Sequence, residues 1–202
     1  MSDKIVCSSE ENCQVDRQRR SFLAIGAAAV GGLFVPALVA PAAEAANFKS
    51  GVIAKGARRV SFRNTHTGES FSGIYRVGDK YLPEAFDQIN VVMRDFRTNQ
   101  VYPMDPRVID IIYMVQRMSG QNRPYDIISG YRSPHTNAML RQTSSGVAKK
   151  SLHMEGKAID LRIDGFSTKR IRDLATSLKA GGVGYYAKSD FVHVDCGDVR
   201  SW

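Results

Sequence analysis

Three residues in the second half of the chain have the side chains of a metal site: His153, Asp160 and His193. Residues 158–163 and 191–196 alternate between apolar and polar side chains, as strands with one buried face do. Asp160 lies on the polar side of the first strand and His193 on that of the second. If the strands are neighbours, these side chains converge, and His153 reaches the same point from the segment before the first strand.

Two imidazole nitrogens and one carboxylate form an open zinc site, whose fourth position is left to a water molecule. Zinc lowers the pKa of such a water to about 7, so that it becomes a nucleophile at neutral pH. Each residue alone is weak evidence, because a histidine in a strand is more often a hydrogen-bonded structural residue than a ligand. The combination predicts one zinc ion per chain.

Three motifs surround these residues and together resemble a known family. They are SGYRSP at 129–134, SLHMEGKAIDL at 151–161 and DFVHVD at 190–195. The set closely resembles the zinc D-alanyl-D-alanine peptidase family, in particular its branch of periplasmic murein endopeptidases, over about residues 58–202. The resemblance implies one zinc peptidase domain with a small antiparallel sheet and flanking helices. It also implies that His153, Asp160 and His193 hold the zinc.

The resemblance further assigns two catalytic roles. The family's catalytic base stands three residues before the last histidine, usually as glutamate, and this position is Asp190 here. Arg132 matches the family's arginine beside the zinc, where a guanidinium stabilises an oxyanion or grips a substrate carboxylate. The alternatives are a turn residue for Asp190 and a solvated surface side chain for Arg132.

Four more residues of these motifs are candidates for contacts with the substrate or with the ligands. Asp195 shares a strand face with the last histidine and can orient its imidazole. Glu155 is a second candidate for the base, with an exposed loop acid as the alternative. Tyr131 and His135 flank Arg132, and we expect them near the cleft, although a capping or surface role for His135 is an equal alternative.

The elements that must position these residues follow an α+β pattern. Strands are predicted at 60–62, 71–75, 125–129, 157–163, 181–186 and 191–196, and helices at 82–97, 106–118, 136–143 and 167–179. In the first two helices, apolar residues recur at helical spacing, which indicates a buried face. Helices and hairpins follow one another without a βαβ rhythm, so we predict an α+β domain. Residues 144–150 are polar and contain a glycine, which predicts a loop.

The first 45 residues have the order of an export signal. Arg19 and Arg20 precede an uncharged stretch rich in alanine and glycine, which ends in Ala43-Glu44-Ala45. Two arginines followed by Ser-Phe-Leu resemble a twin-arginine signal. A membrane anchor is the alternative, but glycine and proline interrupt the stretch, and it holds few leucines or isoleucines, which weighs against a stable span.

These features predict a signal peptide over residues 1–45, a flexible tether over 46–57 and a peptidase domain over 58–202, located in the periplasm. The formal net charge is +8, and the first 45 residues contribute −1, so the remainder carries +9. This surplus favours anionic partners, or serves only as solvated surface charge. Because export argues against nucleic acid, we expect peptidoglycan as the partner, and a monomer without a transmembrane span in the mature chain.

The leading functional hypothesis is hydrolysis of a peptide cross-link in murein, at the D-alanine or diaminopimelate amide bonds that the resemblance implies. A carboxypeptidase that removes terminal D-alanine is the second hypothesis, and it would need a positive pocket for a free carboxylate. The third is a non-catalytic wall-binding module with structural zinc. Three candidate ligands count against that module, because structural zinc sites usually have four protein ligands.

Overall fold

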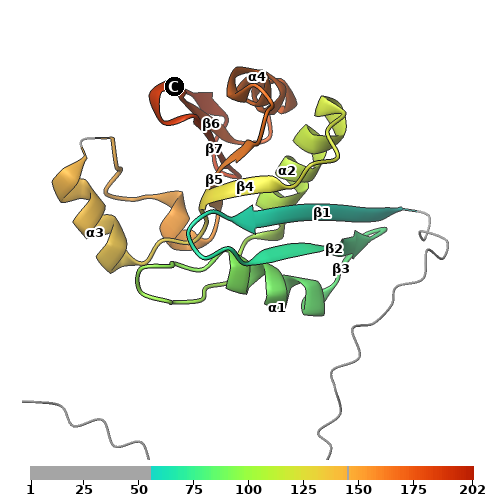
Figure 1. The fold of residues 1–202 in the computed structure, drawn as a ribbon, viewed down its shortest axis with the longest axis horizontal. Helices are drawn as coiled ribbons and strands as arrows, with labels where there is room; N and C mark the ends of the chain where they lie inside the picture. Colours follow the sequence, from blue (N-terminus) through green and yellow to red (C-terminus); the bar gives the residue numbers. More distant parts are fainter. Residues whose placement is uncertain (1–55, 145) are drawn as a thin grey trace, which may run out of the picture. The chain divides into compact units, whose positions relative to one another are not determined.

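The computed structural model describes residues 56–144 and 146–202 (Figure 1). The predicted signal peptide, and the predicted tether up to residue 55, lie outside the described residues. Within the two described ranges, no helix combines the length and the hydropathy that a membrane span requires.

One mixed sheet of eight strands forms the centre of the described part of the chain, in the order β3-β2-β1-β4-β5-β7-β6-β8. Its strands are β1 (Ala57–Asn64), β2 (Ser70–Val77), β3 (Lys80–Tyr81), β4 (Tyr125–Ser129), β5 (Ala158–Ile163), β6 (Gly182–Tyr186), β7 (Phe191–Asp195) and β8 (Arg200–Ser201). Neighbours are antiparallel except for the pairs β1–β4 and β6–β8, which are parallel. The α+β prediction is confirmed, and the sheet is larger than expected because β3 and β8, two residues each, extend it at both edges.

The helices are α1 (Pro83–Val92), α2 (Pro106–Ser119), α3 (Pro134–Thr143) and α4 (Thr168–Leu178). Helices α2 and α4 contact each other and the sheet, and α1 contacts β2. Figure 1 shows α3 standing apart from the other helices. The start of α4 agrees with the prediction, since the Ser167 side chain accepts a hydrogen bond from the Arg170 N–H.

The two faces of the sheet differ in polarity. Its apolar side chains belong to the buried core, among them Val60, Phe62, Tyr125, Ile127, Ile159, Leu161, Ile163, Val192 and Val194. Burying one Ile, Leu or Val side chain contributes about 1.5–3 kcal/mol to the stability of the fold. A shift of the strand register by one residue would replace the buried apolar side chains with those of Asp160, Arg162 and His193. Burial of the apolar set therefore places the polar residues on the opposite face, where the site is built.

The helix predicted at 82–97 ends earlier than expected, at Val92. The carbonyl of Met93 accepts a hydrogen bond from the Tyr131 N–H at 2.7 Å instead of continuing the helix. Phe96, which helical spacing placed on the buried face, stacks on His66 outside the helix, with ring centroids 3.9 Å apart. A contact distant in sequence thus overrides the local periodicity.

Candidate metal centre

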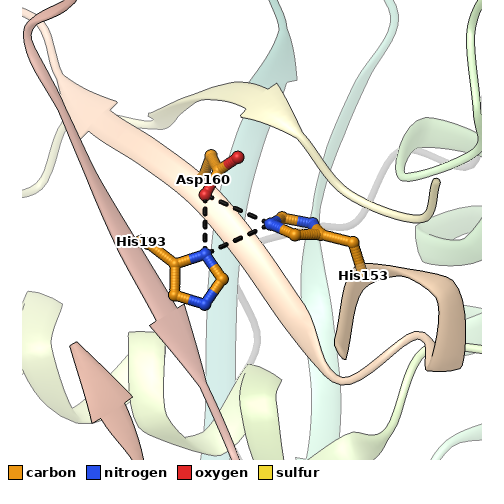
Figure 2. Close-up of side chains that lie close together, drawn as sticks. All are labelled: His153, Asp160 and His193. Carbon is orange, nitrogen blue, oxygen red and sulfur yellow. Dashed lines mark hydrogen bonds and ion pairs between the residues drawn. The ribbon is translucent and has the colours of Figure 1, made fainter. Parts of the chain in front are cut away.

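Figure 2 shows three side chains converging from three elements. Asp160 of β5 and His193 of β7 are direct partners across the two strands, and His153 comes from the 3₁₀ turn η1 (Leu152–Glu155). Asp160 Oδ1 lies 2.8 Å from His193 Nδ1 and 3.2 Å from His153 Nε2. The two imidazole nitrogens are 3.2 Å apart. The structure thus brings together the three residues that the sequence predicted as ligands.

The outward-facing nitrogen of each imidazole contacts a group that accepts hydrogen bonds. His153 Nδ1 lies 2.7 Å from the carbonyl oxygen of Gly130, and His193 Nε2 lies 3.0 Å from Asp195 Oδ2. Each of these nitrogens therefore carries a hydrogen, and whenever the ring is neutral the lone pair of its other nitrogen points into the cluster. Asp195 makes the contact that its strand face predicted.

The arrangement fits a tetrahedral zinc ion. Ligand atoms about 2.0–2.2 Å from such an ion stand roughly 3.3–3.5 Å from one another, slightly more than the separations of 2.8, 3.2 and 3.2 Å found here. Two lone pairs and a carboxylate oxygen at these distances repel one another unless a positive charge lies among them. The donor set therefore requires a cation, either a metal ion or a proton.

The pKa values follow from the same contacts. Burial lowers the pKa of His153, which keeps this ring neutral. Burial opposes the charge on His193 as well, but its hydrogen bonds to Asp160 and Asp195 outweigh burial and raise its pKa to about 9. Burial would raise the pKa of Asp160, but its interactions with the two histidines hold it well below the ordinary value. A metal ion must therefore displace a proton from His193 at neutral pH.

The turn that carries His153 is fixed at both ends. Ser151 caps η1, since its side chain accepts a hydrogen bond from the His153 N–H at 3.3 Å. Gly156 ends it with a φ of 65°, a left-handed conformation that glycine adopts without strain. The His153 carbonyl also accepts a hydrogen bond from the Arg132 N–H at 3.1 Å. The loop that holds the arginine is thereby tied to the turn that holds the first ligand.

Arg132 lies beside the three candidate ligands. Its Nη2 is 3.3 Å from Asp160 Oδ2, the carboxylate oxygen that faces away from the histidines, and 3.3 Å from Ser129 Oγ. The side chain is 12% exposed, and its buried Nε has no hydrogen-bond partner within the described residues. Burial lowers the pKa of Arg132, but a guanidinium remains charged at neutral pH. A fixed positive charge with unused donor capacity thus stands next to the ligands.

Three other predicted residues lie outside the cluster. Tyr131 is buried and stacks on Tyr102, with ring centroids 4.6 Å apart, so it supports the loop of the arginine. His135 is exposed and is not among the described residues that line the cavity at the site. Glu155 is exposed as well, and its carboxylate pairs with Lys157 Nζ at 2.7 Å. These contacts give Tyr131 a supporting position and leave Glu155 and His135 at the surface.

Asp190, the predicted base, is not brought to the three candidate ligands. Its Oδ1 accepts a hydrogen bond from Thr168 Oγ1 at 3.0 Å, and its Oδ2 lies 3.7 Å from Arg162 Nη1. The side chain is 63% exposed and is not among the described residues that line the cavity. The cause is local, because Asp190 follows the 3₁₀ turn η2 (Ala187–Ser189) with a φ of 50°, and the backbone turns before β7 begins. Spacing from His193 alone did not reveal this turn.

A cavity of about 560 Å³ opens at the three ligands. The described residues that line it are Arg132, Ser144, Gly146, Val147, Ala148, Lys150, Ser151, Leu152, His153, Asp160, Tyr186, Ser189, Phe191, His193, Arg200 and Trp202. Among them, Asp160 is the only acidic residue. Residues 144, 146–148 and 150 of the predicted loop line the cavity, as do aromatic residues of β6, β7 and the segment after β8.

Sequence reasoning gave no role to four cavity-lining residues with large side chains, Tyr186, Phe191, Arg200 and Trp202. Tyr186 stacks on Phe191 with ring centroids 4.5 Å apart, and the Trp202 Nε1–H donates a hydrogen bond to the Tyr186 hydroxyl at 3.1 Å. The alternation of β7 could have placed Phe191 on the face of the last histidine. No periodic signal marks Arg200 or Trp202, because the strand before Trp202 has only two residues.

Comparison with known proteins gives a consistent set of relatives. A family model described as peptidoglycan L,D-endopeptidase MepK matches residues 52–202. A probable peptidoglycan L,D-endopeptidase MepK of Haemophilus influenzae is 41% identical over 189 residues, which cover 93% of this chain and 97% of the relative. The peptidoglycan L,D-endopeptidase MepK of Escherichia coli K12 is 40% identical over 187 residues, covering 93% and 98%.

A weaker likeness exists to one solved structure, the L-Ala D-Glu endopeptidase ChiX of Serratia marcescens. It covers 38% of this chain and 62% of that chain, at 17% identity and a TM-score of 0.31. A likeness at this level supports no inference about fold or function.

Proposed function

The chain belongs to the peptidoglycan L,D-endopeptidase MepK family, and on this basis we propose that it is a zinc-dependent endopeptidase that hydrolyses peptide cross-links in peptidoglycan. The observation that carries the proposal is the convergence of His153 Nε2, His193 Nδ1 and Asp160 Oδ1 at the wall of an accessible cavity. Within the described residues the cluster has three members, fewer than the four ligands usual in structural zinc sites. This count favours catalysis over a binding module.

The side chains of the site have distinct tasks in this proposal. The two imidazoles present neutral lone pairs, and the Asp160 carboxylate supplies one negative charge to the metal. When bound, zinc supplies Lewis-acid polarisation of the scissile carbonyl and lowers the pKa of the attacking water. Arg132, held 3.3 Å from Asp160, stabilises the negative charge that develops on the carbonyl oxygen.

Digestion of purified sacculi tests this function. The zinc-loaded protein should release peptides whose new ends lie within the cross-links, and a chelator should stop the release until zinc is restored. Removal of terminal D-alanine alone would indicate a carboxypeptidase instead. A folded, zinc-loaded protein that binds sacculi without cutting them would support the wall-binding module.

The proton acceptor is tested by Asp190→Asn. A positioned base contributes about 10²–10⁴-fold to the rate, but the contacts of Asp190 are with Thr168 and Arg162. We therefore expect this variant to keep the sacculus-cleavage rate within about tenfold of wild type, well below that contribution. Glu155→Gln is measured in the same assay, because this exposed acid is the second candidate for the base.

One result would contradict this expectation. A loss of about 10²-fold or more in Asp190→Asn, with zinc content and melting temperature unchanged, would make Asp190 the base. The same loss in Glu155→Gln alone would assign that role to Glu155.

We further propose that the protein acts in the periplasm and is exported as a twin-arginine precursor with a signal over residues 1–45. The support is the paired Arg19 and Arg20 before an uncharged stretch, in a segment outside the described residues. Replacing both arginines with lysine should leave the precursor in the cytoplasm, as measured by cell fractionation. Export of the wild type in cells that lack the twin-arginine translocase would contradict the proposal.

A further inference from the structure

The Asp195 carboxylate, which accepts a hydrogen bond from His193, also binds Arg200, a residue outside the three sequence motifs. Asp195, which holds the His193 Nε2–H, is fully buried and accepts hydrogen bonds from the Gly182 and Gly197 N–H groups at 3.0 and 2.9 Å. Arg200 donates two more, from Nη2 to Oδ2 at 2.6 Å and from Nη1 to Oδ1 at 3.2 Å. Both oxygens of one carboxylate are thus held by a forked guanidinium.

Arg200 is the charged hydrogen-bond partner of the Asp195 carboxylate. The backbone donors are neutral, and His193 is neutral when it presents its Nδ1 lone pair to a metal. Among the described residues, Arg200 is therefore the one permanently charged donor to a fully buried carboxylate. Losing one partner of such a buried pair is costly, because the remaining charge is left uncompensated. Forked Arg–carboxylate pairs also fix the orientation of the carboxylate.

The fold leaves space for the guanidinium. A Cβ on Gly182 would stand 2.5 Å from Asp195 Oδ2 and 2.6 Å from Arg200 Nη1, so a larger residue there would force the pair apart. Gly182 is also the direct partner of Arg200 across the parallel pair β6–β8. The site of the guanidinium is therefore built by the pairing of the two strands.

The next residues hold β8 in this position. The Trp202 N–H donates to the Val183 carbonyl at 3.2 Å, and the Trp202 carbonyl accepts from the Tyr185 N–H at 3.0 Å. The guanidinium of Arg200 lies over the Trp202 ring, 5.1 Å from its centroid, which favours a cation–π contact. A Cβ on Gly184 would stand 2.7 Å from the indole, so a small residue is required beneath it.

We propose that Arg200 is a positioning residue of the metal centre, which acts through Asp195 to orient the His193 ring so that Nδ1 faces the metal. This inference rests on the proposed zinc-dependent function. Arg200 is 43% exposed and lines the cavity, so a direct grip on the substrate is the competing role. The two roles differ in what they change, because positioning affects metal affinity and kcat, whereas a grip on the substrate affects KM.

The test measures zinc affinity by chelator competition in Arg200→Ala, Arg200→Lys and wild type. Loss of an outer hydrogen-bond partner typically lowers metal affinity or activity about 10–100-fold, so Arg200→Ala should bind zinc about tenfold more weakly. Its kcat should fall while KM stays within about twofold, and Arg200→Lys should recover part of the affinity, since lysine keeps the charge but not the fork. Arg63→Ala is the matched control, because Arg63 pairs with the buried Asp126 in the same sheet at 2.9 Å.

A double-mutant cycle with Asp195→Asn tests whether the effect passes through Asp195. Zinc affinity should fall in Asp195→Asn, and adding Arg200→Ala should then change it by less than about threefold, because contacting residues are not additive. Additive losses, a KM effect with unchanged zinc affinity, or an equal loss in Arg63→Ala would overturn the inference. If Arg200→Ala does not fold, zinc affinities are compared for Arg200→Lys with and without Asp195→Asn, and the same outcomes support or overturn the inference.

Zinc affinity and cleavage of sacculi are separate measurements, so this inference and the proposed function can fail independently. A protein that binds zinc but leaves sacculi intact would refute the function, while the affinity series would still stand. A protein that cuts sacculi, with zinc affinity unaltered by Arg200→Ala and Arg200→Lys, would refute the inference alone.

Discussion

Replacing His153 with alanine is expected to remove the metal and abolish cleavage of sacculi. His153 Nε2 lies 3.2 Å from both other ligand atoms, and with it gone the cluster keeps one imidazole and one carboxylate. Removing the hydrogen-bond partner of a metal ligand lowers metal affinity or activity about 10–100-fold. Removing the ligand itself should therefore lower activity by more than about 100-fold. The measurements are zinc per chain by elemental analysis and the rate of peptide release.

The same variant should remain folded but melt at a lower temperature than the zinc-loaded wild type. The apolar core lies on the opposite face of β5 and β7 and does not include His153, whereas bound metal stabilises the native state by mass action. His135→Ala is the control, because this histidine is exposed and is not among the described lining residues. Equal zinc content in His153→Ala and wild type would remove His153 from the ligand set.

Replacing Arg132 with alanine is expected to lower kcat by about 10²–10³-fold, the usual cost of removing a donor to a developing oxyanion. Its guanidinium is fixed beside Asp160 with one buried nitrogen unpaired within the described residues, so no rearrangement is needed when charge develops nearby. Assays should use saturating zinc, because Asp160 also loses a partner. Arg132→Lys should restore little activity, since lysine keeps the charge but not the fork.

The kinetic parameters decide between the two roles of Arg132 that the sequence left open. A fall in kcat with a small change in KM is the expected result, and it indicates stabilisation of the transition state. A rise in KM with unchanged kcat would instead indicate a grip on a substrate carboxylate. Arg172→Ala, at a side chain paired with Asp173 on α4, is the control for loss of one surface charge.

Much of the candidate site could be predicted from the sequence because it depends on patterns within single strands. Alternating residues in a strand face opposite sides, and an apolar set large enough to require burial determines which side is polar. Asp160 and His193 were therefore expected on polar faces, and the structure pairs them directly. The starts of α4 and α1 also followed from local signals, namely the capping side chain of Ser167 and Pro83 in the first turn.

Other features depended on contacts that local patterns do not contain. The end of α1 is determined by the Met93 carbonyl, which is used by Tyr131 far along the chain. The direction of Asp190 depends on a left-handed backbone conformation after a short turn, which the three-residue spacing did not reveal.

The sequence by itself determined the residue types of the site, the polar faces that carry them and the family to which the chain belongs. Only the tertiary structure decided that Arg200 and Trp202 stand behind and beside His193, and that Asp190 turns toward Thr168 and Arg162. The physical reason is the range of the interactions. Strand alternation and caps act within a few residues, whereas a two-residue strand such as β8 has no period and exists only because β6 offers its edge.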